Sequence, residues 1–386
     1  MSTPLRTQIP NLLDQHPKNP NALLRVHSLL GYLYSTTAKR FLREHHIPME
    51  AIHLLAARAD SIPPPVAPPM HHPIQASREA APAFESWTAI IAAETAVTTV
   101  SNLPMTRRSL NETDPVVGPP LDFVFLQHPD KNRVCLSISE LLDITIIPHM
   151  GSEVIAPPSS STCGPGTLYI DYTTRYATSN QVHNDNNGTY AQSGTVNQVL
   201  VDRFFEHNDY SERIPPLRVA TEMFGHHEAQ NFIDECVLNA IDDHDIVATM
   251  TRITAENIVR QYNRLVAKHC PPDQTIQEVF ICGAGARNMA VVDYIEESLP
   301  KEVITRPLED IGIPGDAKDT VCCAQLGLET ILKFAANEGG PFELNHQSRL
   351  LGEAVRGKNW NSLRSYITKL SNGREVFAVQ RVVVEK

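Results

Sequence analysis

Apolar positions at helical spacing predict several helices along this chain. In residues 21–46 the apolar positions 23, 26, 30, 33 and 41 lie on one helical face, with Thr37 tolerated among them. Pro20 lies just outside the first turn, and Ile47-Pro48 ends the segment. Similar patterns predict further helices at 84–97, 194–207, 248–269 and 316–337. In the helix at 248–269, Thr254 is the expected N-cap.

Runs of β-branched and apolar residues predict strands between these helices. One strand is expected near 98–100, and residues 133–148 indicate a strand pair joined by a tight turn. Residues 275–288 predict a buried strand, a glycine turn and the start of a helix. The Pro-rich stretch 63–83 is typical of a surface loop. Strands that alternate with helices favour an α/β protein whose site lies at the carboxyl ends of strands.

Composition and charge narrow the range of partners. The 386 residues have room for one large or two medium domains, and 42% hydrophobic with 20% charged residues is ordinary for a folded protein. The formal net charge of −11 argues against a nucleic-acid surface, because phosphate backbones are bound by clustered Lys and Arg. We therefore expect no nucleic-acid partner.

Cysteine, histidine and hydropathy patterns add three expected absences. The seven cysteines form no CxxC pair and fit reduced thiols better than a disulfide framework. No histidine spacing resembles a zinc helix, so no metal site is expected from protein ligands alone. No run approaches ~18 apolar residues. We therefore expect a cytoplasmic protein with no membrane partner.

Two glycine turns are the first candidates for binding chemistry. Gly164 and Gly166 flank a proline after a Ser/Thr run, and Gly283 and Gly285 stand between a predicted strand and a predicted helix. Glycine lets the backbone approach a phosphate closely, and a helix N-terminus offers free N–H donors. A tight strand-to-helix turn also needs glycine, so each turn alone is a weak signal. No GxxxxGK[ST] motif occurs, which excludes a P-loop enzyme.

Taken in order, a set of short motifs from about Leu5 to Trp360 resembles the anhydro-N-acetylmuramic acid kinase family. The motifs are TCGPGTLYIDY, NDNNGTYAQSGTV, IPPLRVATEMF, ATMTRITAENIV, ICGAGARN, DAKDTVCCAQLG and LGEAVRGKNW. The resemblance implies a two-lobed actin-like ATPase fold of the α/β class. The family's first phosphate loop has no counterpart here, so we expect a truncated N-terminal lobe. The lobes would be 1–130 with the tail 341–386, and 131–340.

The resemblance also implies a reaction and a set of binding residues. In the family, ATP with Mg²⁺ phosphorylates a 1,6-anhydro amino sugar while water, activated by a carboxylate base, opens the anhydro ring. Arg108 would contact the sugar. If the chain is active, ATP and Mg²⁺ are the implied cofactors; otherwise it needs none. The nucleotide would be bound at Gly164, Gly166, Gly283, Gly285 and Asn288.

Two departures from the family pattern concern catalysis. Thr162 occupies the position of the general base, and a threonine hydroxyl is far too weak a base to deprotonate water near neutral pH. Glu140 replaces a glycine of a phosphate-binding turn and adds a like charge near the nucleotide. No catalytic residue is assigned, and we expect a catalytically impaired phosphotransferase.

Two alternatives stay open beside a divergent sugar kinase. The chain could be a non-catalytic homologue that binds a metabolite or regulates a partner. It could also be an enzyme with other chemistry based on Cys163, His183 or Glu140, although a buried inert thiol is the more ordinary role for Cys163. A homodimer is compatible with either.

Overall fold

The computed structural model describes most of the chain as an α/β protein. The described residues are 20–58, 86–101, 103, 121–151, 159–208, 226–270, 274–337 and 353–371. The predicted acceptor contact Arg108 and the Pro-rich stretch 63–83 lie outside them. The α/β class expected from the sequence is confirmed, with mixed rather than purely parallel sheets.

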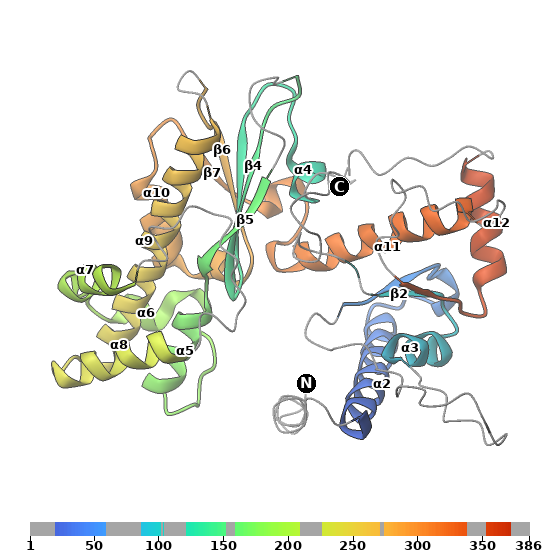
Figure 1. Ribbon diagram of the computed structural model, residues 1–386, viewed down its shortest axis with the longest axis horizontal. Helices are drawn as coiled ribbons and strands as arrows, with labels where there is room; N and C mark the ends of the chain where they lie inside the picture. The colour runs from blue at the N-terminus through green and yellow to red at the C-terminus, as the bar shows by residue number, and fades with distance from the viewer. Residues whose placement is uncertain are drawn as a thin grey trace, which may run out of the picture. The chain divides into compact units, whose positions relative to one another are not determined.

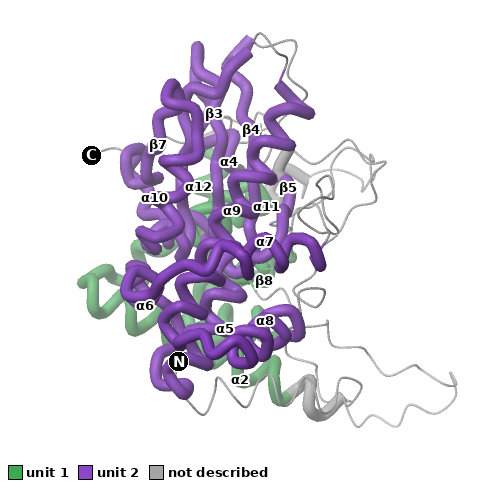
Figure 2. The backbone as a smooth tube through the Cα atoms, turned by 90° about the vertical axis from the view of Figure 1, so that its left-hand side faces the viewer, with its two compact units in different colours: residues 1–117, 320–379 green, residues 118–319, 380–386 purple. Residues whose placement is uncertain are grey.

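The chain forms two compact units, each built from two stretches (Figure 2). Unit 1 comprises residues 1–117 and 320–379, and unit 2 comprises residues 118–319 and 380–386. The lobe boundaries implied by the family resemblance, at 130 and 340, stay predictions.

Unit 1 packs helices against a small three-stranded sheet. Its strands, in the order β1-β2-β8, are Leu55–Ala56, Thr99–Ser101 and Glu353–Val355; β1 and β2 run parallel, and β2 and β8 run antiparallel. Its helical segments are α2 (Pro20–Glu44), η1 (Met49–Ala51), α3 (Trp87–Thr95) and α12 (Trp360–Ser371). A Cβ at Gly31 would lie 2.6 Å from Ile90 Cβ, so the crossing of α2 and α3 depends on glycine at this position.

Unit 2 is organised around a five-stranded mixed sheet. Its strands, in the order β5-β4-β3-β6-β7, are Ser159–Pro165, Leu141–Ile147, Arg133–Ile138, Glu278–Cys282 and Ile304–Pro307. Strand β3 pairs in parallel with β6 and antiparallel with β4. Because β3 and β6 run the same way, their carboxyl ends meet at one edge of the sheet.

Helices surround this sheet and continue from its edges. The α-helices of unit 2 are α4 (Leu121–Leu126), α5 (Leu168–Ala177), α6 (Thr189–Ser193), α7 (Gln198–His207), α8 (His226–Leu238), α9 (Asp243–His269) and α10 (Met289–Ser298), and most of α11 (Lys318–Asn337) belongs to unit 1. The 3-10 turns are η3 (Asn186–Gly188), η5 (Ala284–Arg287), η6 (Leu308–Ile311) and η7 (Gly315–Ala317). Helix α11 begins in unit 2 and continues into unit 1.

The two faces of the five-stranded sheet differ in chemistry. On one face Val134, Leu136 and Ile144 pack with apolar residues of α9 and α10 into a buried core. Figure 1 shows these two helices beside the sheet. Side chains alternate along a strand, so the residues between them point to the opposite face. That face carries polar groups, including Asp143 and Thr145, and it is the face on which the candidate site lies.

Most predicted elements agree with the structure, and one predicted cap is wrong. The helices expected at 21–46, 84–97 and 316–337 are α2, α3 and α11. The long helix α9 begins at Asp243 rather than near Thr254, and the Asp242 carboxylate caps it by accepting a hydrogen bond from His244 N at 3.0 Å. Thr254 is buried in the middle of this helix.

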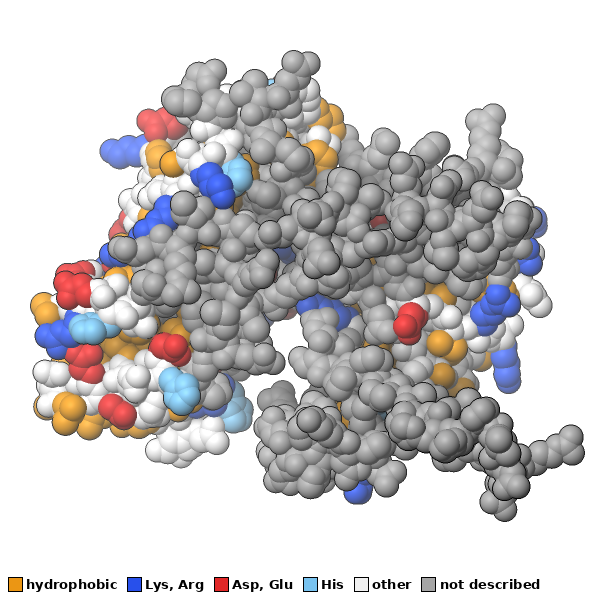
Figure 3. Space-filling view, viewed as in Figure 1, with side chains coloured by type: hydrophobic (Ala, Val, Ile, Leu, Met, Phe, Trp, Pro, Cys, Tyr) orange, Lys and Arg blue, Asp and Glu red, His pale blue; other side chains and the backbone are white. Residues whose placement is uncertain are grey.

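Two surface observations bear on the expected partners. Among the described residues, no helix is both long and apolar enough to cross a bilayer. On the face shown in Figure 3, described acidic and basic side chains lie intermixed.

Candidate functional site

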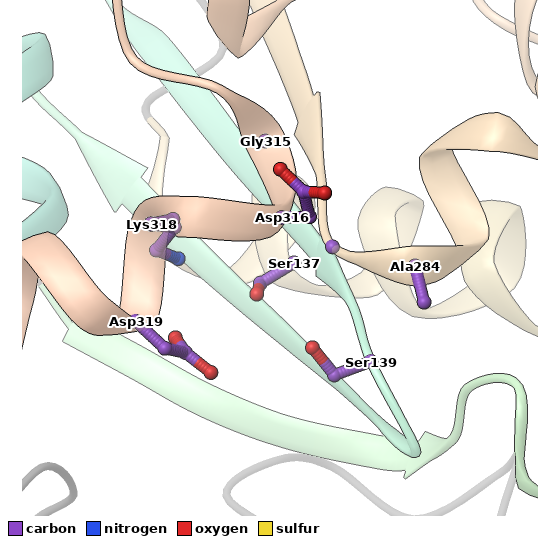
Figure 4. A pocket seen from close by; sticks show the side chains of 8 residues that line it. Ser137, Ser139, Ala284, Gly315, Asp316, Lys318 and Asp319 are labelled. Carbon is purple, nitrogen blue, oxygen red and sulfur yellow. The ribbon is translucent and has the colours of Figure 1, made fainter. Parts of the chain in front are cut away.

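A small pocket lies at the carboxyl ends of β3 and β6. The described residues enclose about 200 Å³ there. The lining residues come from the ends of both strands and from the start of α11, and they are Ser137, Ser139, Gly283, Ala284, Gly315, Asp316, Lys318 and Asp319. Figure 4 shows the two serines projecting toward the side from which Lys318 and Asp319 extend. In open α/β sheets, ligands bind outside the carboxyl ends of strands, so this is the position expected of a binding site.

The predicted glycine turn after β6 forms one wall of this pocket. Gly283 has a φ of +87°, and a Cβ there would lie 2.5 Å from Ile138 O. A Cβ at Gly285 would lie 2.3 Å from Ile138 Cγ2. Asn288 caps α10 by accepting a hydrogen bond from Val291 N at 3.4 Å. Gly283 therefore lines the pocket, while Gly285 and Asn288 have packing and capping roles; nucleotide binding by all three stays a prediction.

The Gly-Pro-Gly turn at residues 164–166, called the elbow below, is hydrogen-bonded to the turn between β3 and β4. Gly166 N donates to Glu140 O at 2.8 Å, and Thr167 N donates to Ser139 O at 2.7 Å. A Cβ at Gly166 would lie 2.1 Å from Ser139 O, and Gly164 has a φ of +128°. The amides of Gly166 and Thr167 therefore hold the fold together in this structure. Nucleotide binding by Gly164 and Gly166 stays a prediction.

A polar row crosses four strands beside the pocket. Cys282 of β6, Ser137 of β3, Asp143 of β4 and Thr162 of β5 are paired in register. Residues paired in this way point to the same face of a sheet. The Thr162 hydroxyl donates to Asp143 Oδ1 at 2.6 Å, and both side chains are only partly buried. The position expected to hold a base therefore holds a hydroxyl in contact with a carboxylate.

A buried ion pair lies behind the pocket. Lys318 Nζ is 2.7 Å from Asp122 Oδ1, and the Thr145 hydroxyl donates to Asp122 Oδ2 at 2.6 Å. Burial is the largest influence and disfavours the charged lysine, but the charge and hydrogen bond of Asp122 and the neighbouring thiols of Cys135 and Cys282 together outweigh it. The pKa of Lys318 is therefore raised well above its usual value. The lysine is therefore a cation whose charge is already balanced.

The remaining charged groups make the pocket rim acidic. Asp316 and Asp319 are exposed, and Arg287 forms an ion pair with Asp316. The carboxylate of Asp319 would therefore repel a polyphosphate, and a divalent cation would offset that repulsion. Mg²⁺ is usually held by one or two carboxylates together with phosphate oxygens and water, and the carboxylate of Asp319 with the serine hydroxyls suits that chemistry. Among the described residues, no cluster of three or more His, Cys, Asp or Glu is arranged to hold a metal alone.

Other residues singled out by the sequence lie apart from the pocket lining. The Cys163 thiol is fully buried and donates to Ser161 O at 3.1 Å, and burial together with the charge of Asp143 raises its pKa. This confirms that the Cys163 thiol is buried, as favoured from the sequence, and its lack of reactivity stays a prediction. Glu140 is exposed, and its carbonyl oxygen accepts the elbow amides of Gly166 and Leu168. His183 is exposed in the segment between α5 and η3.

Sequence reasoning missed three side chains at this site: Asp122, Asp143 and Lys318. The alternation along β4 was the available signal, since Asp143 and Thr145 fall between apolar residues of the core face. Near the elbow, Asp171 accepts from the Thr167 hydroxyl at 3.0 Å. Burial nevertheless raises the pKa of Asp171 to about 6.

Comparison with known proteins assigns the chain to a family. A family model described as anhydro-N-acetylmuramic acid kinase matches residues 1–341. A curated relative of that name from Caldanaerobacter subterraneus subsp. tengcongensis is 26% identical over 332 residues, which cover 85% of this chain and 80% of the relative. Another, from Bacillus cereus (strain ATCC 10987 / NRS 248), is 27% identical over 349 residues, covering 87% and 85%.

Similarity to solved structures is weaker. The activator of the 2-hydroxyisocaproyl-CoA dehydratase from Clostridium difficile, with bound ADPNP, aligns with 58% of this chain and 68% of its own, at 12% identity and a TM-score of 0.32. That score supports no argument about the fold. The match of the family model over residues 1–341 decides the assignment: the chain belongs to the anhydro-N-acetylmuramic acid kinase family.

Proposed function

We propose that this protein is an ATP-dependent phosphotransferase whose acceptor is a 1,6-anhydro amino sugar. The family assignment and the names of the curated relatives support this function. The observation that carries it is the pocket at the carboxyl ends of β3 and β6, lined by two serine hydroxyls and two glycines. Hydroxyls and close backbone approach suit a phosphate chain, and the acidic rim suits one that arrives with Mg²⁺.

Each group in the site has a proposed role. The phosphates would lie against Gly283 and the hydroxyls of Ser137 and Ser139, and Asp319 would hold Mg²⁺, which would offset the phosphate charge. Gly166 would act indirectly by fixing the turn that carries Ser139. A two-lobed actin-like architecture, acceptor binding by Arg108, a cytoplasmic location and a homodimer belong to the same proposal.

Phosphoryl transfer depends mostly on positioning and on charge stabilisation. The described residues would supply the positioning, because the pocket is fixed by strand ends and the buried Lys318–Asp122 pair anchors the start of α11. Charge stabilisation would come from Mg²⁺, because the charge of Lys318 is already balanced. The general base is the one function that the position of Thr162 does not supply on its own.

One observation favours a second candidate, a non-catalytic metabolite-binding homologue. The elbow amides of Gly166 and Thr167 are engaged by carbonyls, and the base position carries a hydroxyl. Such a protein would bind the nucleotide or the sugar without turnover, whereas the proposed enzyme would consume ATP only when the acceptor is present.

The test is product formation from Mg²⁺-ATP and 1,6-anhydro-N-acetylmuramic acid, followed by mass spectrometry. The proposed function predicts a product whose mass is that of the acceptor plus one phosphoryl group (HPO3) and one water, with one ADP released per product. Binding of ATP or sugar without any product would favour the non-catalytic homologue.

A further inference from the structure

We propose that Asp143 is the general base of this enzyme and that Thr162 relays the proton to it. The inference rests on the proposed phosphotransferase function. It starts from one contact, the hydrogen bond of 2.6 Å that the Thr162 hydroxyl donates to Asp143 Oδ1. A threonine hydroxyl cannot remove a proton from water unaided, but one that is hydrogen-bonded to a carboxylate can pass the proton on.

The position of Asp143 suits this role. In the antiparallel pair of β3 and β4, Asp143 is the register partner of Ser137, which lines the pocket. Side chains paired in this way have Cβ atoms about 5 Å apart. A sugar whose reacting oxygen faces the phosphate in the pocket would therefore extend over the neighbouring strand, where Asp143 and Thr162 lie.

The backbone holds the pair in place. The register between β4 and β5 shifts between Leu142 and Asp143, which is a bulge in the ladder. Bulges redirect individual side chains and are common beside active sites. Beyond this bulge, Asp143 faces Thr162 directly, while the neighbouring Cys163 points into the apolar core on the other face. The two polar side chains thus share the face that bears the pocket.

The proposed step balances as follows. Water gives one proton to Thr162 Oγ1 as the threonine gives its own proton to Asp143, and the resulting hydroxide oxygen bonds to the anomeric carbon of the sugar. The bond between that carbon and the bridging oxygen breaks, and its electron pair stays on the oxygen. That oxygen bonds to the γ-phosphorus, ADP leaves with the electrons of the broken P–O bond, and Asp143 later releases its proton to solvent.

Asp171 is the rival carboxylate near the elbow. Its side chain accepts from Thr167, at the start of α5, and no described contact joins it to Thr162 or to the residues that line the pocket. The comparison of Asp143→Asn with Asp171→Asn therefore separates the two assignments.

The experiment measures ADP release and sugar phosphate formation by wild type, Asp143→Asn, Asp171→Asn and the surface control Asp202→Asn. The amide in Asp143→Asn still accepts the Thr162 hydrogen bond, so the fold is expected to survive, and melting temperatures check this. We expect Asp143→Asn to reduce kcat by about 100-fold or more, with the Mg²⁺-ATP melting shift retained. Asp202 is exposed on α7, where it accepts from Gln198, and its variant should match wild type.

Variants of the relay keep the inference testable even if Asp143→Asn fails to fold. Thr162→Val removes the hydroxyl and should lose far more activity than Thr162→Ser, which keeps it. The double variant with Thr162→Asp and Asp143→Asn returns a carboxylate to the row. Its kcat should be at least tenfold higher than that of Asp143→Asn alone. A structural role for Asp143 predicts no such recovery.

The outcomes separate the two proposals. Turnover that survives Asp143→Asn, or that is lost in Asp171→Asn instead, would overturn the base assignment and leave the proposed function intact. Equal activity of the Thr162→Val and Thr162→Ser variants would overturn the relay. A wild type that forms no sugar phosphate would overturn the proposed function, and the base assignment with it.

Discussion

Gly166 illustrates, at the scale of single residues, how packing constrains the elbow. Its amide donates to Glu140 O, and its Cα faces the carbonyl of Ser139 so closely that no side chain fits. The neighbouring Ser139 lines the pocket. A change at Gly166 would therefore disturb both the stability of unit 2 and the position of a site residue.

Gly166→Ala is predicted to lower the free energy of unfolding by about 3 kcal/mol, because a Cβ that lies 2.1 Å from a backbone oxygen forces the chain to move. Gly315→Ala is the matched control, since the nearest atom to its Cβ, Glu309 Oε1, is 3.4 Å away. The control should change stability by less than about 1 kcal/mol. Urea unfolding curves measure both, and equal effects would contradict the packing explanation.

Single residues also show which features of the site the sequence alone does not predict. The hydroxyl at Thr162 and the glycine turns were visible in the sequence, together with the buried thiol of Cys163. The carboxylate that contacts Thr162 was not, because Asp143 lies on another strand and reaches it only after a bulge shifts the register. Hydrophobic alternation predicts the face of a residue, but it does not predict the partner across the ladder.

Helix α9 shows, at the scale of elements, why helix starts are harder to predict than helix faces. Its apolar spacing was read correctly from 248 onward, but the helix begins at Asp243. Asp242 caps it, and acidic residues at 243 and 245 complement the positive end of the helix dipole. Thr254 resembles an N-cap in sequence only, since it is buried and its hydroxyl has no hydrogen-bond partner among the described residues.

Asp242→Ala is therefore predicted to destabilise the protein by about 1 kcal/mol, because the first turn loses its cap. Thr254→Val, which has almost the same shape, should stabilise it by about 1 kcal/mol, because it removes a buried polar group without a partner. Chemical denaturation of both variants gives the two values. A loss of stability in Thr254→Val would show that the hydroxyl is satisfied.

Ion pairs connect the amino ends of β3 and β6. Glu278 is buried, with Oε1 2.7 Å from Lys131 Nζ and Oε2 2.7 Å from Arg133 Nη2. Burial raises the pKa of Glu278, but the hydrogen bonds and charges of Lys131 and Arg133 outweigh it, and the pKa is lowered overall. The ionised carboxylate therefore stabilises the fold. That contribution is complete above the unfolded pKa of about 4.3 and is lost as the pH falls through the lower folded value.

Glu278→Gln is predicted to be about 2 kcal/mol less stable than wild type at pH 7, because a charge-assisted hydrogen-bond network is broken. The difference should shrink as the pH falls from about 4.3 through the lowered pKa of the carboxyl group. Urea unfolding at a series of pH values measures it. Glu44→Gln, in an exposed pair with Arg40, is the control and should show a much smaller difference. A stability difference between wild type and Glu278→Gln that does not change with pH would contradict a stabilising role for the ionised Glu278 carboxylate.

At the scale of the whole molecule, the α/β class and the family were accessible from the sequence, because motifs in a fixed order survive where individual site residues differ. The pocket in unit 2 could be predicted only in part from the sequence. Its glycines stood out in the sequence, but its rim of Asp316 and Asp319 and the balanced charge of Lys318 depend on where α11 begins. The acidic rim leads to a specific expectation, that nucleotide binding requires Mg²⁺.

The most direct test of the account is the melting temperature with ATP, measured with and without Mg²⁺ in wild type and in two tryptophan variants. Ala284→Trp fills the pocket from an exposed lining position, and Leu238→Trp places the same side chain on an exposed position of α8. We predict a stabilisation of about 2.7 kcal/mol when ATP is a hundredfold above its dissociation constant. It should require Mg²⁺, be lost in Ala284→Trp and be kept in Leu238→Trp. No shift in wild type, or an undiminished shift in Ala284→Trp, would contradict the assignment of this pocket.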